Sequence, residues 1–147
     1  MTERPRARVR SGLEGLLARP GDLAGLRVGL LANPASVTRE LVHAALALKG
    51  CRSFRLAALF GPEHGVWANA QDLIEVDDSR DPVTGLPVHS LYGRTRVPTP
   101  EMLGGLDVVV VDLQDLGSRY YTFIYTMLHV LEACARDGRR AWKISSR

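Results

Sequence analysis

The run Asp107–Leu113 (DVVVVDL) places four valines in succession, with no alternation of apolar and polar residues. A strand with one solvated face would alternate, whereas a strand covered on both faces reads as a continuous apolar run. Strands of that kind occur almost only in parallel sheets that have helices on both sides. The run therefore predicts a central strand of an α/β sheet.

Three further apolar runs have the length and composition of strands: Leu26–Leu31, Phe54–Phe60 and Val88–Leu91. Helices are predicted over Val37–Lys49, where Ser36 would cap the first turn, and over Tyr120–Ala135. Strands that alternate with helices are typical of a parallel sheet. The region Gly65–Pro100 has the length of a loop that is either functional or disordered.

The composition indicates one globular domain, and the distribution of charge argues against a nucleic-acid partner. The 147 residues are 46% hydrophobic and 24% charged, which suits a single core with an ordinary surface. The net charge of +3 is uneven, because arginines gather at the N-terminus: Arg4, Arg6, Arg8 and Arg10. No aromatic residues interleave this arm, which favours a solvated end over a nucleic-acid interface. Cys51 and Cys134 lack CxxC spacing, which favours free thiols, although a single pairing stays open.

Targeting and cofactor signals are absent from the sequence. No apolar run approaches the length of a membrane-spanning helix, and Ser11–Leu17 is too short and interrupted for a signal-peptide core. There is neither a P-loop nor a GxGxxG motif, so nothing predicts a nucleotide site. We expect a cytoplasmic protein with no nucleic-acid or membrane partner; the sequence leaves its oligomeric state open.

Glu63 and His64 lie side by side in the segment LFGPEHG, directly after the predicted strand Phe54–Phe60. In open α/β sheets, ligands bind at the carboxyl ends of the strands. A glutamate held in a partly dry pocket there is a candidate general acid. The residues alone leave open the alternative that Glu63 caps a turn and His64 bonds to the backbone.

A second polar cluster follows the central strand, and parallel strands bring it to the same edge of the sheet. Its members are Asp112, Gln114, Asp115, Ser118 and Arg119, with Tyr120 and Tyr121 next. Two carboxylates that face one cleft can hydrolyse glycosides, and an arginine can bind a substrate carboxylate through two hydrogen bonds. The alternative is that Asp115 caps the next helix and pairs with Arg119.

Six segments, taken in order, resemble the exo-β-N-acetylmuramidase family, formerly the DUF1343 proteins and now glycoside hydrolase family 171. They are LLANP at 30–34, LFGPEHGV at 59–66, AQD at 70–72, TGLPVHSLYG at 84–93, PTPEML at 98–103 and VVDLQDLGSRYYTFIYTM at 110–127. The resemblance implies a Rossmann-like parallel sheet flanked by helices that carries the cleft, and a separate C-terminal domain that completes it. It also implies release of terminal N-acetylmuramic acid from peptidoglycan fragments in cell-wall turnover or recycling, with no metal or organic cofactor.

The resemblance also implies roles for particular residues. Glu63 becomes the expected catalytic acid, with His64 beside it and Asp115 as the second carboxylate. The expected substrate-binding residues are Gln71, Asp112, Gln114, Arg119 and Tyr121. Of these, Asp112 is also a candidate for the second carboxylate, and Arg119 would suit the lactyl carboxylate of muramic acid.

The chain departs from the family pattern at two places. Trp67-Ala68 stands where members usually carry Arg-Gly, and Trp67 is able to stack on a sugar ring. After Gly138 the sequence no longer resembles the family, so we expect a frameshift or premature stop that leaves the hydrolase truncated and weak or inactive. The expected division is an arm and lead-in helix over 1–25, an incomplete Rossmann-like domain over 26–138 and a divergent tail over 139–147. The alternatives are a non-catalytic muropeptide-binding module or pseudoenzyme fragment, and a plain α/β domain in which Glu63 and Asp115 are structural.

Overall fold

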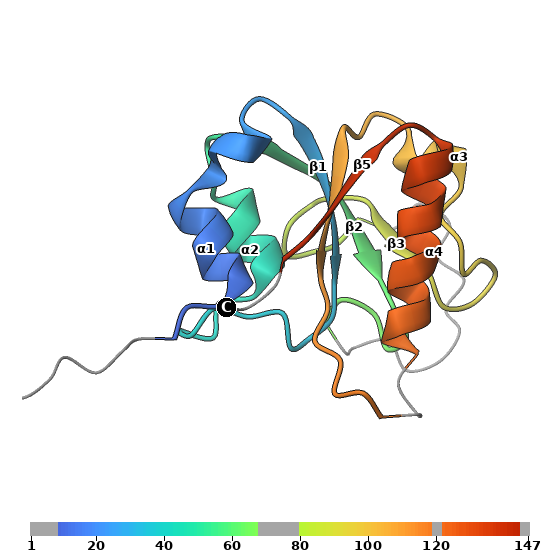
Figure 1. Ribbon diagram of the computed structural model, residues 1–147, viewed down its shortest axis with the longest axis horizontal. Helices are drawn as coiled ribbons and strands as arrows, with labels where there is room; N and C mark the ends of the chain where they lie inside the picture. The colour runs from blue at the N-terminus through green and yellow to red at the C-terminus, as the bar shows by residue number, and fades with distance from the viewer. Residues whose placement is uncertain (1–8, 68–79, 119–121, 145–147) are drawn as a thin grey trace, which may run out of the picture.

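The computed structural model describes residues 9–67, 80–118 and 122–144, which form a parallel sheet between two layers of helices (Figure 1). The five strands are β1 (Arg27–Ala32), β2 (Arg55–Gly61), β3 (Val88–Ser90), β4 (Val108–Asp112) and β5 (Arg140–Lys143). Their order across the sheet is β3-β2-β1-β4-β5, and every neighbouring pair is parallel. The predicted α/β fold with a parallel sheet is confirmed.

Helices cover both faces of this sheet. Their bounds are α1 (Gly12–Ala18), the 3₁₀ helix η1 (Pro20–Leu23), α2 (Ala44–Lys49), α3 (Pro100–Leu103) and α4 (Phe123–Arg136). α1 and α2 lie on one side of the sheet, and α3 and α4 lie on the other (Figure 1). None of the helices in the described ranges is long and apolar enough to cross a membrane.

The unbroken apolar run of β4 is explained by two separate cores. Val108 and Val110 pack into the core that α1 and α2 cover, whereas Val109 and Val111 pack into the core under α4. Successive side chains of a strand point to opposite faces, so a strand buried on both sides needs apolar residues at every position. The interpretation of this run as a strand covered on both faces is confirmed.

The predicted helix over Val37–Lys49 is wrong in its first half. α2 begins only at Ala44, and the cap is His43, whose Nδ1 accepts a hydrogen bond from the Ala45 amide at 3.2 Å. Before it, an isolated antiparallel bridge joins Val37 to His43. Ser36 does not cap this helix, because its hydroxyl donates to the Asp112 carbonyl and so ties the loop after β1 to the end of β4.

The strand order creates a topological switch point between β1 and β4, where the direction in which the chain adds strands to the sheet reverses. From β1 the chain proceeds to β2 and β3 on one side, and it returns through β4 and β5 on the other. In doubly wound sheets, the loops that leave the two strands at such a point diverge and open a crevice for ligands. The loops after β1 and β4 are therefore the natural borders of a site.

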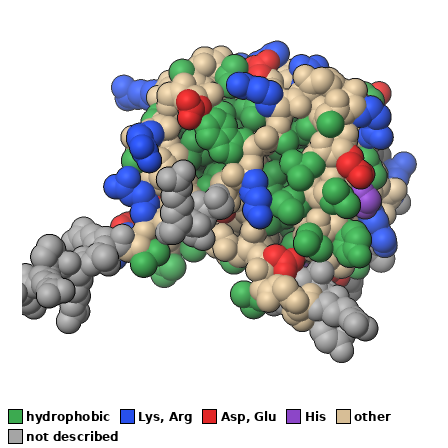
Figure 2. Space-filling view, in the orientation of Figure 1, with side chains coloured by type: hydrophobic (Ala, Val, Ile, Leu, Met, Phe, Trp, Pro, Cys, Tyr) green, Lys and Arg blue, Asp and Glu red, His purple; other side chains and the backbone are tan. Residues whose placement is uncertain are grey.

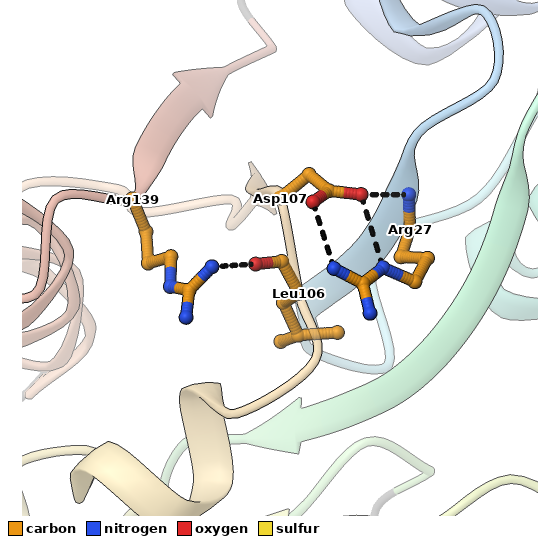
Figure 3. A network of polar contacts seen from close by, with 4 residues as sticks. All are labelled: Arg27, Leu106, Asp107 and Arg139. Atoms are coloured by element: carbon orange, nitrogen blue, oxygen red, sulfur yellow. Dashed lines mark hydrogen bonds and ion pairs between the residues drawn. The ribbon is translucent and has the colours of Figure 1, made fainter.

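At the opposite edge, side chains fasten β1 to the start of β4 (Figure 3). The Asp107 carboxylate accepts hydrogen bonds from the Arg27 amide at 2.7 Å, from Nε at 3.2 Å and from Nη2 at 3.0 Å. Arg139, which precedes β5, donates from Nη1 to the Leu106 carbonyl at 2.8 Å. This polar cluster joins the amino ends of β1, β4 and β5, at the edge of the sheet opposite to Glu63 and Asp112.

Candidate active site at the carboxyl edge of the sheet

Glu63 and His64 occupy a tight turn that begins where β2 ends. The Gly65 amide donates to the Pro62 carbonyl at 2.9 Å, and His64 has a φ of 67°, which is uncommon for a residue with a side chain. The turn folds back so closely on the strand that a Cβ at Gly61 would lie 3.0 Å from the Gly65 Cα. Glycine at position 61 therefore allows the turn, and the turn fixes the direction of Glu63.

The half-buried Glu63 carboxylate is held by two hydroxyl groups from other elements. Thr122, at the start of α4, donates from Oγ1 to Glu63 Oε2 at 3.0 Å. The Tyr92 hydroxyl, two residues after β3, also bonds to Glu63, and this carboxylate raises the pKa of Tyr92. The Thr122 side chain makes no capping hydrogen bond to α4, because its hydroxyl donates to Glu63 instead. Three segments distant in sequence thus converge on one carboxylate.

A pocket of about 300 Å³ opens beside these two hydroxyl groups. Its lining residues are Leu91, Tyr92, Arg96, Thr122, Tyr125, Thr126 and His129. Tyr92 and Thr122 belong both to this lining and to the partners of Glu63. The carboxylate therefore lies at the border of a concave surface that offers aromatic, hydroxyl and cationic groups.

Sequence reasoning missed Tyr92 and Thr122, although a signal for both was present. Tyr92 follows a predicted strand at the edge where ligands bind, and Thr122 lies near the start of the predicted helix. Hydroxyl groups at those two points are within reach of a carboxylate that follows the neighbouring strand. What was missing was the order of the strands, which places β3 beside β2.

Asp112, the last residue of β4, is only 3% exposed. Burial raises the pKa of its carboxyl from 3.8 to about 6, and the hydrogen bond from Gln114 opposes that rise. Gln114 Nε2 lies 3.5 Å from Asp112 Oδ1, and the Gln114 carbonyl accepts from Asn33 Nδ2 at 3.3 Å. Asn33 and Ser36, of which only Ser36 was assigned a role from the sequence (a helix cap), thus border the switch point together with Asp112.

Asp115 lies in the exposed loop after β4, where its Oδ1 accepts from the Gly117 amide at 2.6 Å. It does not cap α4, whose N-cap residue is Thr122. Because β1 separates β2 from β4, and strands lie about 4.8 Å apart, the ends of these two strands are roughly 10 Å apart. Among the described residues, no hydrogen bond joins Glu63 to Asp112 or Asp115.

The remaining predicted site residues fall into two groups. His64 is exposed in the turn, on the carboxyl side of β2. Gln71, Arg119 and Tyr121 lie outside the described residues. In the part of the chain that is described, no three His, Cys, Asp or Glu side chains are grouped so that they could hold a metal ion.

Trp67, which the sequence suggested as a residue able to stack on a sugar ring, makes two contacts within the protein. Its indole packs on the His43 ring, with 4.2 Å between ring centroids, and Nε1 donates to Asp81 Oδ1 at 2.9 Å. Asp81 Oδ2 also accepts from the Thr84 amide at 2.6 Å. Burial lowers the pKa of His43, which fits a neutral imidazole whose Nδ1 accepts a hydrogen bond. Trp67 therefore anchors the segment after Glu63 to the start of α2.

Comparison with known proteins identifies relatives of this arrangement. The family model for the N-terminal part of the exo-β-N-acetylmuramidase NamZ matches residues 28–143, which include β5. The peptidoglycan β-N-acetylmuramidase NamZ of Bacillus subtilis (strain 168) is 46% identical over 132 residues, which cover 89% of this chain and 32% of that protein. The chain thus spans about a third of the length of this relative.

Two solved structures of DUF1343 family proteins from Bacteroides fragilis NCTC 9343 share the fold. One has a TM-score of 0.84 and 42% sequence identity, and the match covers 95% of this chain and 35% of that one. The other has a TM-score of 0.74 and 28% identity, over 94% of this chain and 35% of that one. The family model spans most of the sequence, and the likeness extends to the three-dimensional structure. The chain therefore belongs to the NamZ N-terminal family of the DUF1343 proteins.

Proposed function

We propose that this chain provides the acid-bearing part of an exo-β-N-acetylmuramidase, which releases terminal N-acetylmuramic acid from peptidoglycan fragments. The observation that carries the proposal is the fixed position of Glu63 at the carboxyl edge, beside a pocket that can receive a sugar. The Bacillus subtilis relative is described as a peptidoglycan β-N-acetylmuramidase, which supports the same class of substrate.

In this proposal, Glu63 protonates the oxygen of the scissile glycosidic bond. Protonation lets the leaving group depart while positive charge develops on the sugar ring. The hydroxyl groups of Tyr92 and Thr122 hold the carboxyl in one orientation, so little ordering is needed when substrate arrives. His64, next in the same strained turn, would contact the substrate or orient Glu63.

Asp115 is the better candidate for the second carboxylate. It is exposed on the same edge of the sheet, where water and a sugar have access. Asp112, in contrast, is buried, and its raised pKa of about 6 keeps much of it protonated under mildly acidic conditions. Asp112 and Gln114 would then shape the crevice at the switch point.

The substitution Glu63→Gln tests the proposal, because it removes the proton and keeps the shape of the side chain. We expect hydrolysis of a chromogenic β-N-acetylmuramide to fall by about 10²–10⁴-fold, the usual contribution of a general acid. The matched control is Glu101→Gln, an exposed glutamate in α3, which should leave hydrolysis unchanged.

Two results would contradict the assignment. Unchanged hydrolysis by Glu63→Gln would exclude Glu63 as the acid. Binding of the muramide by the unsubstituted protein with no turnover at all would instead indicate a sugar-binding module. A calorimetric titration run beside the assay distinguishes these two cases.

A further inference from the structure

The pocket beside Glu63 is built by two segments that face each other. The loop after β3 contributes Leu91, Tyr92 and Arg96, and the first turns of α4 contribute Tyr125 and its neighbours. The volume of about 300 Å³ is at the lower end of the range for small-molecule sites, which suits a single sugar ring rather than an oligosaccharide.

Two aromatic side chains of this pocket are exposed. Tyr92 is 42% exposed and Tyr125 is 63% exposed, although both rings line a concavity. Tyrosine combines an apolar ring with a polar hydroxyl, so it can cover the apolar face of a sugar and still bond to its hydroxyl groups. Thr122 and Thr126 add hydroxyl groups that both donate and accept hydrogen bonds.

Arg96 gives this pocket a positive charge, and its guanidinium forms no ion pair with a carboxylate of the described residues. Its guanidinium carbon lies 5.7 Å from the centroid of the Tyr92 ring, which holds the side chain over that ring. The planar guanidinium therefore keeps its donors available for a carboxylate.

We propose that this pocket is the subsite for a sugar that bears a carboxylate, with Arg96 binding the carboxylate and Tyr92 and Tyr125 contacting the ring. The inference rests on the proposed function, since muramic acid carries a lactyl carboxylate. It assigns recognition of that group to Arg96 rather than to Arg119. Arg96 lies over the ring of Tyr92, and the Tyr92 hydroxyl bonds to Glu63, so the loop after β3 would both recognise the sugar and orient the acid.

The test is a titration with two non-hydrolysable methyl β-thioglycosides, one of N-acetylmuramic acid and one of N-acetylglucosamine. The second sugar lacks the lactyl group and is otherwise the same. The 147-residue chain should bind the acidic sugar more tightly, and this preference should decrease as salt is added. Arg96→Gln should weaken binding of the acidic sugar about tenfold, as expected for the loss of a hydrogen bond between charged groups. It should change binding of the neutral sugar less than about twofold.

Two further variants complete the design. Arg52→Gln is the matched control, because Arg52 is an exposed arginine before β2, at the opposite edge of the sheet. It should leave both affinities unchanged. Tyr125→Ala should weaken both sugars to a similar extent, since the ring contacts what the two have in common.

The subsite is overturned if Arg96→Gln keeps the preference for the acidic sugar, or if the unsubstituted chain binds neither sugar at millimolar concentration. The first of these results leaves the proposed function intact, because that depends on Glu63 and on turnover. A preference that requires Arg96, combined with hydrolysis that does not require Glu63, would support the subsite and contradict the proposed acid.

Discussion

Two aspartates at opposite ends of the same strand show how the surroundings set the properties of a carboxyl. Asp107 stands just before β4, and hydrogen bonds from Arg27 lower its pKa to about 2. Asp112 ends β4, and burial raises its pKa to about 6. The Asp107 carboxylate is therefore ionised at neutral pH and joins two strands, whereas the Asp112 carboxyl changes charge near pH 6.

Asp112 should make the folded state less stable as the pH rises. Between pH 4 and pH 6 its carboxyl is protonated in the folded chain and ionised in the unfolded chain, so the unfolded state binds fewer protons. A shift from 3.8 to about 6 corresponds to at most about 3 kcal/mol at pH 7. Asp112→Asn removes this cost and should be more stable than the unsubstituted chain at pH 7.

Urea unfolding at pH 4 and at pH 7 measures this effect. The difference in unfolding free energy between Asp112→Asn and the unsubstituted chain should grow from pH 4 to pH 7. A difference that stays constant over this range would show that Asp112 does not titrate with a raised pKa.

At the scale of elements, the cluster of Arg27 and Asp107 joins β1 to β4 at their amino ends. A carboxyl whose pKa is lowered stabilises the fold above its unfolded pKa, and the stabilisation is lost as the pH falls toward its folded pKa. For Asp107 the window runs from 3.8 down to about 2. Asp107→Asn should therefore lower the melting temperature at pH 7, and its difference from the unsubstituted chain should shrink below pH 4.

Thermal melts at pH 7, pH 4 and pH 2.5 check this expectation. Asp22→Asn is a suitable control, because Asp22 is exposed in η1. An Asp107→Asn difference that is the same at all three pH values would mean that the lost interactions do not depend on the charge.

Four of the five strands were predictable from the sequence because each one carries its own apolar signal, whereas β5 (Arg140–Lys143) lies in the expected divergent tail and was not predicted. Phe54–Phe60 and β2 (Arg55–Gly61), for example, differ by one residue at each end. α2 was predicted too long because the apolar residues Leu41 and Val42 fit helical spacing. A long-range hydrogen bond holds the start of this segment out of a helix, since the Ser36 hydroxyl donates to the carbonyl of Asp112, 76 residues away. Leu41, with a φ of 61° and 80% exposure, then lies in a turn rather than in a helix.

At the scale of the whole molecule, the sequence predicted that Glu63 and Asp112 lie at one edge of the sheet, but not the order of the strands along it. Every strand run pointed to a parallel sheet, yet no local pattern states that β1 lies between β2 and β4. That order decides which polar residues meet. Because of this strand order, the Glu63 carboxylate meets the hydroxyl groups of Tyr92 and Thr122. The same order places Asp112 beside Asn33 and Ser36.

The position of β5 at the end of the sheet leads to a last expectation about the whole molecule. The amides of Arg140 and Ile144 donate to β4, so those of the alternate residues Ala141 and Lys143 point outward. No described strand pairs with this outer side, and hydrophobic side chains gather on the face that carries β5 (Figure 2). Unpaired edges of this kind promote pairing between copies of a chain.

We therefore expect the 147-residue chain to self-associate through β5, and Ala141→Lys to oppose this association. A lysine at the exposed position 141 would bring like charges together in the paired edges and should raise the dissociation constant about fivefold. Sedimentation equilibrium measures the constant, and Ala24→Lys adds the same charge at an exposed position outside the sheet. Equal weakening by both variants would attribute the effect to net charge alone. An unsubstituted chain that stays monomeric at the highest concentrations would show that the edge of β5 does not pair.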